Sequence, residues 1–146
     1  MITLSEVTKE NFYECCNLKR EVFDYVGNAE SVLAEAYIYR DVATPYAIYL
    51  DDSIIGMVLM DTYVSDGVCE FTDLFISDDY RNKGLGESVV RHVIDYLLKK
   101  GAERIKITVN KANDKALHIY QKTGFVIEKT SEWDEDFVIM TYLSDH

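Results

Sequence analysis

The sequence has few cysteines and only one proline, and the cysteines form no recognisable motif. The three cysteines, Cys15, Cys16 and Cys69, have no metal-ligand spacing and leave an odd count. Reduced thiols in a cytoplasmic protein are therefore the simplest interpretation, and no metal site is expected. The single proline, Pro45, is predicted to mark the start of a strand.

The sequence also lacks an excess of positive charge. Its formal net charge is −11, so no basic stripe for nucleic acid is expected. An acidic surface raises the local concentration of positively charged ligands, which fits a cationic small substrate. Acidity that serves solubility alone is the commoner explanation, and both readings remain open.

Long hydrophobic runs are missing as well. The longest, such as Ile54–Met60, have the length of a strand, whereas a membrane helix needs about 20 apolar residues. The N-terminus shows no basic segment before an apolar stretch, so we expect neither a signal peptide nor contact with a membrane. With 146 residues, 48% of them hydrophobic, the chain predicts one domain spanning residues 1–146 with a single core and no linker.

Apolar spacing and turn residues predict eleven elements in the order β-α-α-β-β-β-α-β-α-β-β. Strands are expected over Ile2–Val7, Tyr46–Leu50, Ile54–Tyr63, Val68–Ile76, Arg104–Val109, Val126–Thr130 and Phe137–Leu143, with a turn at Ser65–Gly67. Helices are expected over Asn11–Arg20 after a Thr8 cap, Ser31–Tyr39 with a Ser31 cap, Leu85–Leu98 before Gly101, and Asn113–Lys122. This pattern indicates an α/β (α+β) domain with a largely antiparallel first half and one strand-helix-strand crossover.

A glycine loop, Arg81–Gly86, follows one strand and opens directly into the most regular helix. Inward-pointing backbone N–H groups and the positive end of the helix dipole would suit a diphosphate. Two other nucleotide motifs fail here: no Gly-Lys-Ser/Thr follows for a Walker loop, and Val89 stands where a Rossmann fingerprint needs glycine. A tight turn without a ligand is the alternative for the loop taken alone.

The loop resembles motif A of the GNAT superfamily of acyl-CoA N-acyltransferases, Arg/Gln-x-x-Gly-x-Gly/Ala, which Arg81–Gly86 matches at every specified position. The resemblance implies a mixed, mostly antiparallel twisted sheet flanked by helices and acetyl-CoA as co-substrate. It assigns to the coenzyme the loop and the strand before it: Leu74, Phe75, Ile76, Arg81, Asn82, Lys83, Gly84, Leu85, Gly86 and Glu87.

A second signature, Asn113-x-x-Ala116-x-x-x-Tyr120-x-x-x-Gly124-Phe125, resembles motif B of the same family. Asn113, Ala116 and Tyr120 fall on one helix face, and the resemblance places them at the coenzyme, with Tyr120 near its sulfur. A tyrosine can donate the proton that a departing thiolate needs, so Tyr120 is predicted to be the general acid. The alternative for Tyr120 alone is an amphipathic core tyrosine.

The acceptor amine must lose a proton, and Glu70 is the candidate general base, with Asp73 as its competitor. Because the two lie three residues apart on one strand, they are expected on opposite faces, with Glu70 on the face of Thr72. Thr72 stands where a related enzyme has a carboxylate implicated as base, so that role does not transfer directly. A backbone N–H around Leu74–Ile76 is expected to stabilise negative charge on the thioester oxygen.

The N-terminal half resembles bacterial spermine/spermidine or diamine acetyltransferases, which implies a polyamine acceptor and a homodimer. A polyamine needs spaced carboxylates and aromatic faces. The residues of these types are Asp24, Tyr25, Glu30, Glu35, Tyr37, Tyr39 and Asp73, of which Glu30, Glu35 and Asp73 are predicted to bind the substrate. Solvated acids and packing tyrosines explain them equally well. Another amine, such as a protein N-terminus, a lysine or an aminoglycoside, and a catalytically silent acyl-CoA sensor remain alternatives.

Overall fold

One sheet runs through the molecule. The computed structural model describes residues 1–21, 25–61 and 66–144, and within them seven strands lie in the order β1-β2-β3-β4-β5-β7-β6. The strands are β1 (Ile2–Glu6), β2 (Ala43–Leu50), β3 (Ser53–Asp61), β4 (Val68–Ile76), β5 (Arg104–Asn110), β6 (Val126–Thr130) and β7 (Phe137–Leu143). The helices are α1 (Phe12–Cys16), α2 (Ala29–Ile38), α3 (Leu85–Lys99) and α4 (Asp114–Lys122), with a 3-10 turn, η1 (Asp78–Tyr80).

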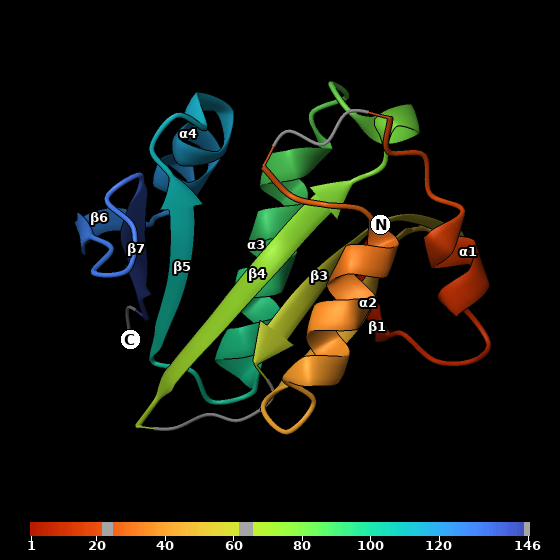
Figure 1. The fold of residues 1–146 in the computed structure, drawn as a ribbon, viewed down its shortest axis with the longest axis horizontal. Coiled ribbons are helices and arrows are strands. Elements are labelled where there is room, and N and C mark those ends of the chain that lie inside the picture. Colours follow the sequence, from red (N-terminus) through yellow and green to blue (C-terminus); the bar gives the residue numbers. More distant parts are fainter. Residues whose placement is uncertain (22–24, 62–65, 145–146) are drawn as a thin grey trace.

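The predicted mixed, mostly antiparallel sheet is confirmed. Neighbouring strands are antiparallel except β4 and β5, which are parallel and are connected by the crossover helix α3. The parallel pair is registered only where Val68–Glu70 meets Arg104–Lys106. Beyond that point the two strands diverge toward their C-terminal ends, as Figure 1 shows.

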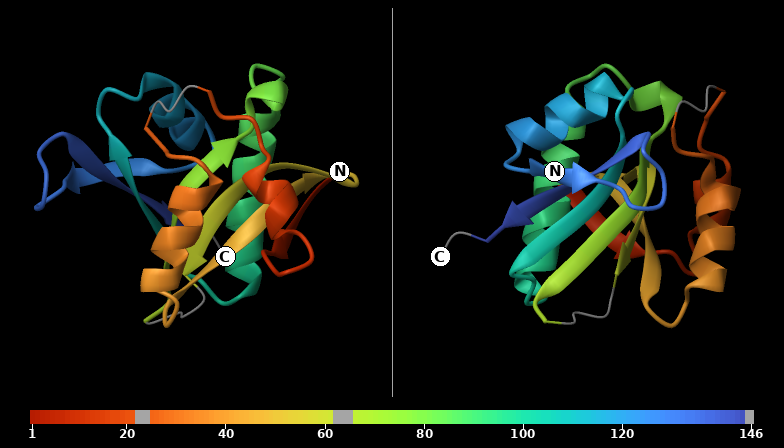
Figure 2. Two further views of the ribbon diagram at one scale, coloured as in Figure 1. Left: turned by 45° about the vertical axis from the view of Figure 1, so that its right-hand side comes forward. Right: turned by 60° about the vertical axis from the view of Figure 1, so that its left-hand side comes forward.

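Helices cover the two faces of the sheet separately (Figures 1 and 2): α3 lies on one face, and α1 and α2 lie on the other. The predicted apolar stripe of α3 is buried against the first face. Val32 and Ala36 of α2 are buried with Met57 and Phe75 on the second face. Strand β3 is apolar and buried over almost its whole length, because it has helices on both sides. Among the described residues, no helix is long and apolar enough to cross a membrane.

The first two helices differ from prediction. Helix α1 stops at Cys16 instead of Arg20, because the chain beyond it bonds to the far end of β4, where the Asp78 N–H donates to the Lys19 carbonyl at 2.8 Å. Thr8 does not cap α1, whose first flanking residue is Asn11. Helix α2 begins before Ser31, and it is Asn28 that accepts a bond from the Ser31 N–H. Asparagine and serine cap helices equally well, so residue type alone does not predict whether Asn28 or Ser31 caps α2.

Strand β2 begins at Ala43, so Pro45 lies inside the strand and not at its start. The Pro45 carbonyl accepts a bond from the Val7 N–H, so the proline nitrogen also faces β1. Because proline has no N–H, Pro45 gives β1 one bond where another residue in this register would give two, and the pairing with β1 ends at Tyr46. Tyr63 and Ser65, predicted in a strand end and a turn, lie outside the described residues.

Candidate active site

A bulge in β4 decides which side chains face which side of the sheet. Asp73 has a φ of 56°, and the pairing with β3 shifts so that Asp73 and Leu74 together oppose Val58. One extra residue reverses the alternation of side chains beyond it. Phe71 and Leu74 therefore both contact the core under α3, while Phe75 joins the core under α2.

The expectation that Glu70 and Asp73 lie on opposite faces is therefore wrong. Asp73 is hydrogen-bonded to Glu35 of α2, and Glu70 lines a cavity together with Glu35 and Thr72. Both carboxylates thus face α2. Strict alternation fails because it assumes one residue per step of the strand, and Asp73 itself belongs to the bulge, where two residues take one step.

The cavity beside α2 is acidic. It has a volume of about 460 Å³, and its polar lining includes Glu35, Tyr39, Asp61 and Glu70. Burial, together with the hydrogen bond and charge of Asp73, raises the pKa of Glu35 from 4.5 to about 7. Burial and the nearby Glu70 charge also raise the pKa of Asp61, although the Glu70 N–H donates to that carboxylate. Ionising Glu35 and Asp61 is therefore unfavourable in this cavity.

The larger cleft lies on the other side of β4, where β4 and β5 diverge. Its volume is about 890 Å³, and it is lined by the end of β4, the glycine loop, the start of α3 and one face of α4. It brings together every residue predicted to hold the coenzyme except Lys83: Leu74, Phe75, Ile76, Arg81, Asn82, Gly84, Leu85, Gly86, Glu87, Asn113, Ala116 and Tyr120. Lys83 is exposed, with its ammonium 5.8 Å from the Tyr80 ring centroid.

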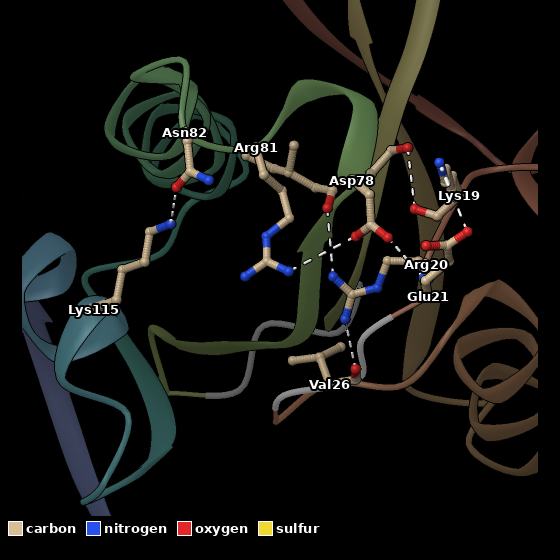
Figure 3. Close-up of polar contacts among 10 residues, drawn as sticks. Lys19, Arg20, Glu21, Val26, Asp78, Arg81, Asn82 and Lys115 are labelled. Carbon is tan, nitrogen blue, oxygen red and sulfur yellow. Dashed lines mark hydrogen bonds and ion pairs between the residues drawn. The ribbon is translucent and has the colours of Figure 1, made fainter.

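The glycine loop has the backbone of an anion site. Gly84 adopts a φ of 75° immediately before α3, and Asn82 adopts a φ of 61°. Alternating left-handed residues at a helix N-terminus turn successive N–H groups toward one point. The Asn82 side-chain oxygen also accepts a bond from the Lys115 ammonium of α4 at 3.0 Å (Figure 3), which connects the two walls of the cleft.

Two residues of the loop region have roles that the sequence does not show. A Cβ on Gly86 would lie 3.0 Å from the Ile119 Cδ1 atom, so this glycine lets α4 approach α3. Glu87 places a carboxylate in the cleft, but the Lys122 ammonium lies 3.0 Å from it and lowers its pKa. This ion pair compensates a negative charge that would otherwise oppose a bound phosphate.

Helix α4 presents the predicted face. The Asn113 side-chain oxygen accepts a bond from the Ala116 N–H at 3.2 Å and so caps the helix. The Tyr120 ring packs edge-on against Phe71 and Phe125, with centroids 6.0 and 5.6 Å apart. Burial raises the pKa of the Tyr120 phenol above its usual range, so the group carries its proton at neutral pH. Tyr120 is therefore both a packing residue and a proton-carrying group at the cleft.

The structure does not bring every predicted acceptor residue together. Glu30 is exposed and lies beside Cys16, where burial first and then Glu30 raise the pKa of the thiol. Tyr37 is 64% exposed under the Arg40 guanidinium, whereas Tyr39 lines the acidic cavity. Asp24 lies outside the described residues.

Sequence reasoning missed part of the cleft. Lys115, His118 and Lys122 line it as well, but they share a face of α4 that is turned away from Asn113, Ala116 and Tyr120, so the periodicity of the predicted motif did not indicate them. Arg20, Tyr25 and Val26 also line it but come from a distant segment. Tyr25 reaches across to donate to the Ala112 carbonyl at 3.3 Å. No local pattern predicts these contacts.

Residues 12–125 match the acetyltransferase (GNAT) family. The chain belongs to this family. It is 27% identical to the uncharacterized N-acetyltransferase YvbK of Bacillus subtilis over 99% of this chain and 84% of that protein. It is 32% identical to the mycothiol acetyltransferase of Corynebacterium efficiens over 52% of this chain. That alignment spans only 25% of the mycothiol enzyme, and the alignment with the streptothricin acetyltransferase of Streptomyces lavendulae spans 45% of that relative.

Solved structures share the fold. The spermidine N-acetyltransferase of Vibrio cholerae, in complex with CoA and spermine, has a TM-score of 0.75 at 19% identity, covering 97% of this chain and 95% of that one. The aminoglycoside acetyltransferase AAC(6')-Ib, in complex with coenzyme A, has a TM-score of 0.77 at 19% identity, covering 98% and 95%. At these identities the likeness shows the fold alone.

Proposed function

We propose that residues 1–146 form one N-acetyltransferase domain that transfers the acetyl group of acetyl-CoA to a primary amine, and that the amine is a polyamine such as spermidine or spermine. The observation that carries the proposal is the cleft between the diverging strands β4 and β5. It has the glycine loop on one wall and Tyr120 on another. Membership of the family supports the reaction class.

The residues of the cleft fit acetyl-CoA. The positive-φ residues Asn82 and Gly84 and the start of α3 offer backbone donors for its diphosphate. Leu74 and Ile76 give an apolar wall for the pantetheine arm. When bound, acetyl-CoA supplies the acetyl group as an activated thioester.

Two proton transfers fall to residues of this chain. A tyrosine carries its proton at neutral pH, and burial raises the pKa of Tyr120 further; we propose that Tyr120 supplies that proton to the leaving thiolate. On the other side of β4, Glu70 is the proposed base, and Asp73 is the alternative now that both face α2. The bulge at Asp73 and Leu74 interrupts the ladder to β3, which supports a backbone donor near Leu74 for the thioester oxygen.

The polyamine assignment rests on the acidic cavity. Glu35, Asp73 and Glu70 lie on one side of β4, and burial and the neighbouring Asp73 make ionised Glu35 unfavourable without a counter-charge. A chain of ammonium groups provides such counter-charges at several points. The net charge of −11 adds long-range attraction for a polycation.

A panel of amines with acetyl-CoA, followed by release of the free thiol, tests the proposal. Spermidine and spermine should have the highest kcat/KM, and their advantage over monoamines should shrink as salt screens the acidic surface. Preference for an aminoglycoside, which the likeness to AAC(6')-Ib makes the second candidate, would keep the reaction class and refute the polyamine. Tight coenzyme binding without turnover of any amine would favour a sensor.

We also propose a cytoplasmic homodimer, as the family resemblance implies. The buried thiols of Cys15 and Cys69 are unpaired among the described residues, which is compatible with a reducing compartment. Sedimentation velocity of the purified protein tests the assembly, and a monomer at micromolar concentration would refute it.

A further inference from the structure

The segment after α1 is joined to the end of β4 by a set of hydrogen bonds. The Asp78 N–H donates to the Lys19 carbonyl at 2.8 Å, and the Glu21 N–H donates to the Asp78 carboxylate at 2.7 Å. The Ser77 hydroxyl, which is buried, reaches the same Lys19 carbonyl at 3.3 Å. Figure 3 shows these contacts beside Arg81, whose guanidinium lies 3.8 Å from Asp78.

Arg20 stands in the middle of this junction and bridges two walls. Its guanidinium donates to the Val26 carbonyl at 2.7 Å and to the Ile76 carbonyl at 3.4 Å (Figure 3). The same group lies over the Phe75 ring, 4.8 Å from its centroid. A planar guanidinium can bond two carbonyls and stack on a ring at once, which an ammonium cannot do.

Both carbonyls belong to residues that line the coenzyme cleft, and Val26 also leads into α2 on the acceptor side. Ile76 ends β4 at the coenzyme cleft. Val26 lies just before Asn28, the cap of α2, and α2 carries Glu35 to its contact with Asp73. A helix behaves as a rigid rod, so fixing its first turn also fixes where Glu35 lies.

We propose that Arg20 is a positioning residue that locks the start of α2 to the end of β4, so that the acceptor carboxylates are held in register with the coenzyme cleft. This inference rests on the proposed function for its kinetic consequence but not for its structural one. Arg20 acts through Val26, Phe75 and Ile76, and because its side chain also lines the coenzyme cleft, the affinity for CoA is measured beside the kinetics.

The test compares Arg20→Met with Lys19→Met. The control removes the neighbouring cation, whose side chain is exposed and pairs only weakly with Glu21 at 3.8 Å, while its backbone contacts stay. Arg20→Met should raise the KM of the amine and lower kcat/KM about tenfold or more, since buried charge-assisted bonds are lost. The Kd of CoA, measured by calorimetry, should change by less than about threefold. Arg20→Lys should recover part of the loss.

Amide hydrogen exchange gives a readout that needs no turnover. Arg20→Met should speed exchange of the Ser31 and Asp78 amides about tenfold relative to wild type, because the junction opens locally. Lys19→Met should leave both rates unchanged. Unchanged exchange in a folded Arg20→Met protein overturns the inference, and so does a loss confined to CoA affinity, which would make Arg20 a coenzyme ligand. If wild-type protein acetylates no amine, the proposed function fails while the exchange result still decides the role of Arg20.

Discussion

The two sides of β4 are built in different ways. The coenzyme cleft depends mainly on backbone: two positive-φ residues, a helix start and the separation of two strands. The acidic cavity depends on side chains from α2, β3 and β4, and on how their charges interact. Single side-chain changes should therefore alter use of the amine readily, whereas coenzyme binding should respond chiefly to changes of backbone conformation.

The largest expected effect lies where the two sides meet. Tyr120→Phe removes a hydroxyl and keeps the ring that packs on Phe71 and Phe125. If Tyr120 is the general acid, kcat should fall by about 10²–10⁴-fold while KM moves little. Steady-state kinetics with saturating acetyl-CoA measures this. A variant that keeps most of its activity would show that water or another group supplies the proton, and lost CoA affinity would make Tyr120 a binding residue.

The glycine loop tests the backbone side of the comparison. Gly84 has a φ of 75° with open space where a Cβ would lie, whereas Gly86 has ordinary helical geometry and faces the flexible end of Ile119. Forcing an L-residue into the left-handed region costs about 1–2 kcal/mol, so Gly84→Ala should weaken CoA binding about tenfold. Gly86→Ala should weaken CoA binding less than Gly84→Ala does. Gly86→Val should weaken CoA binding more than Gly86→Ala does. Calorimetry with CoA gives the Kd of each variant. Equal affinities of Gly84→Ala and wild type would mean that the loop is not part of the binding site.

The acidic cavity tests the side-chain half. Glu35→Gln and Asp73→Asn each remove a charge, and kcat/KM for spermidine should fall about tenfold through loss of a charge-assisted contact. CoA affinity should not change. Glu30→Gln is the matched change on the same helix: because Glu30 lies beside Cys16, we expect less than about a twofold effect. A larger loss of kcat/KM for Glu30→Gln than for Glu35→Gln would mean that the amine binds at the exposed side of α2 and not in the acidic cavity.

The smallest effect concerns stability. Glu35 has a pKa of about 7 in the folded protein against an ordinary 4.5, so the folded state binds more protons between these values. Its contribution to the free energy of unfolding is therefore complete below the ordinary pKa and is lost as pH rises through about 7. Glu35→Gln cannot ionise, so its melting temperature relative to wild type should rise as the pH increases from about 5 to about 8. A difference that stays flat with pH would mean that Glu35 is not held protonated.

The motifs that are contiguous in the chain lie together in the structure. Arg81–Gly86 and the face of Asn113, Ala116 and Tyr120 were recognised, and all but Lys83 of the coenzyme residues line one cleft. Lys83 does not line the cleft, because a loop's backbone motif does not reveal which way each side chain leaves it. Strand β4 was predicted with correct ends, but its bulge was not. Nothing in the residue types of Thr72–Leu74 demands an extra residue.

The sequence by itself determined the order of elements, the parallel crossover and the coenzyme motifs, because apolar periodicity and glycine positions are local properties that survive without knowledge of neighbours. Tertiary structure alone decided the register of β3 against β4, and hence that Glu70 and Asp73 share a face. It also decided that α1 ends early so that Lys19 and Arg20 can bond to the end of β4. The register depends on pairs such as Met57 with Phe75, and the early end of α1 depends on hydrogen bonds between residues more than fifty positions apart. The energies of such tertiary contacts outweigh the weak local preferences that the sequence displays.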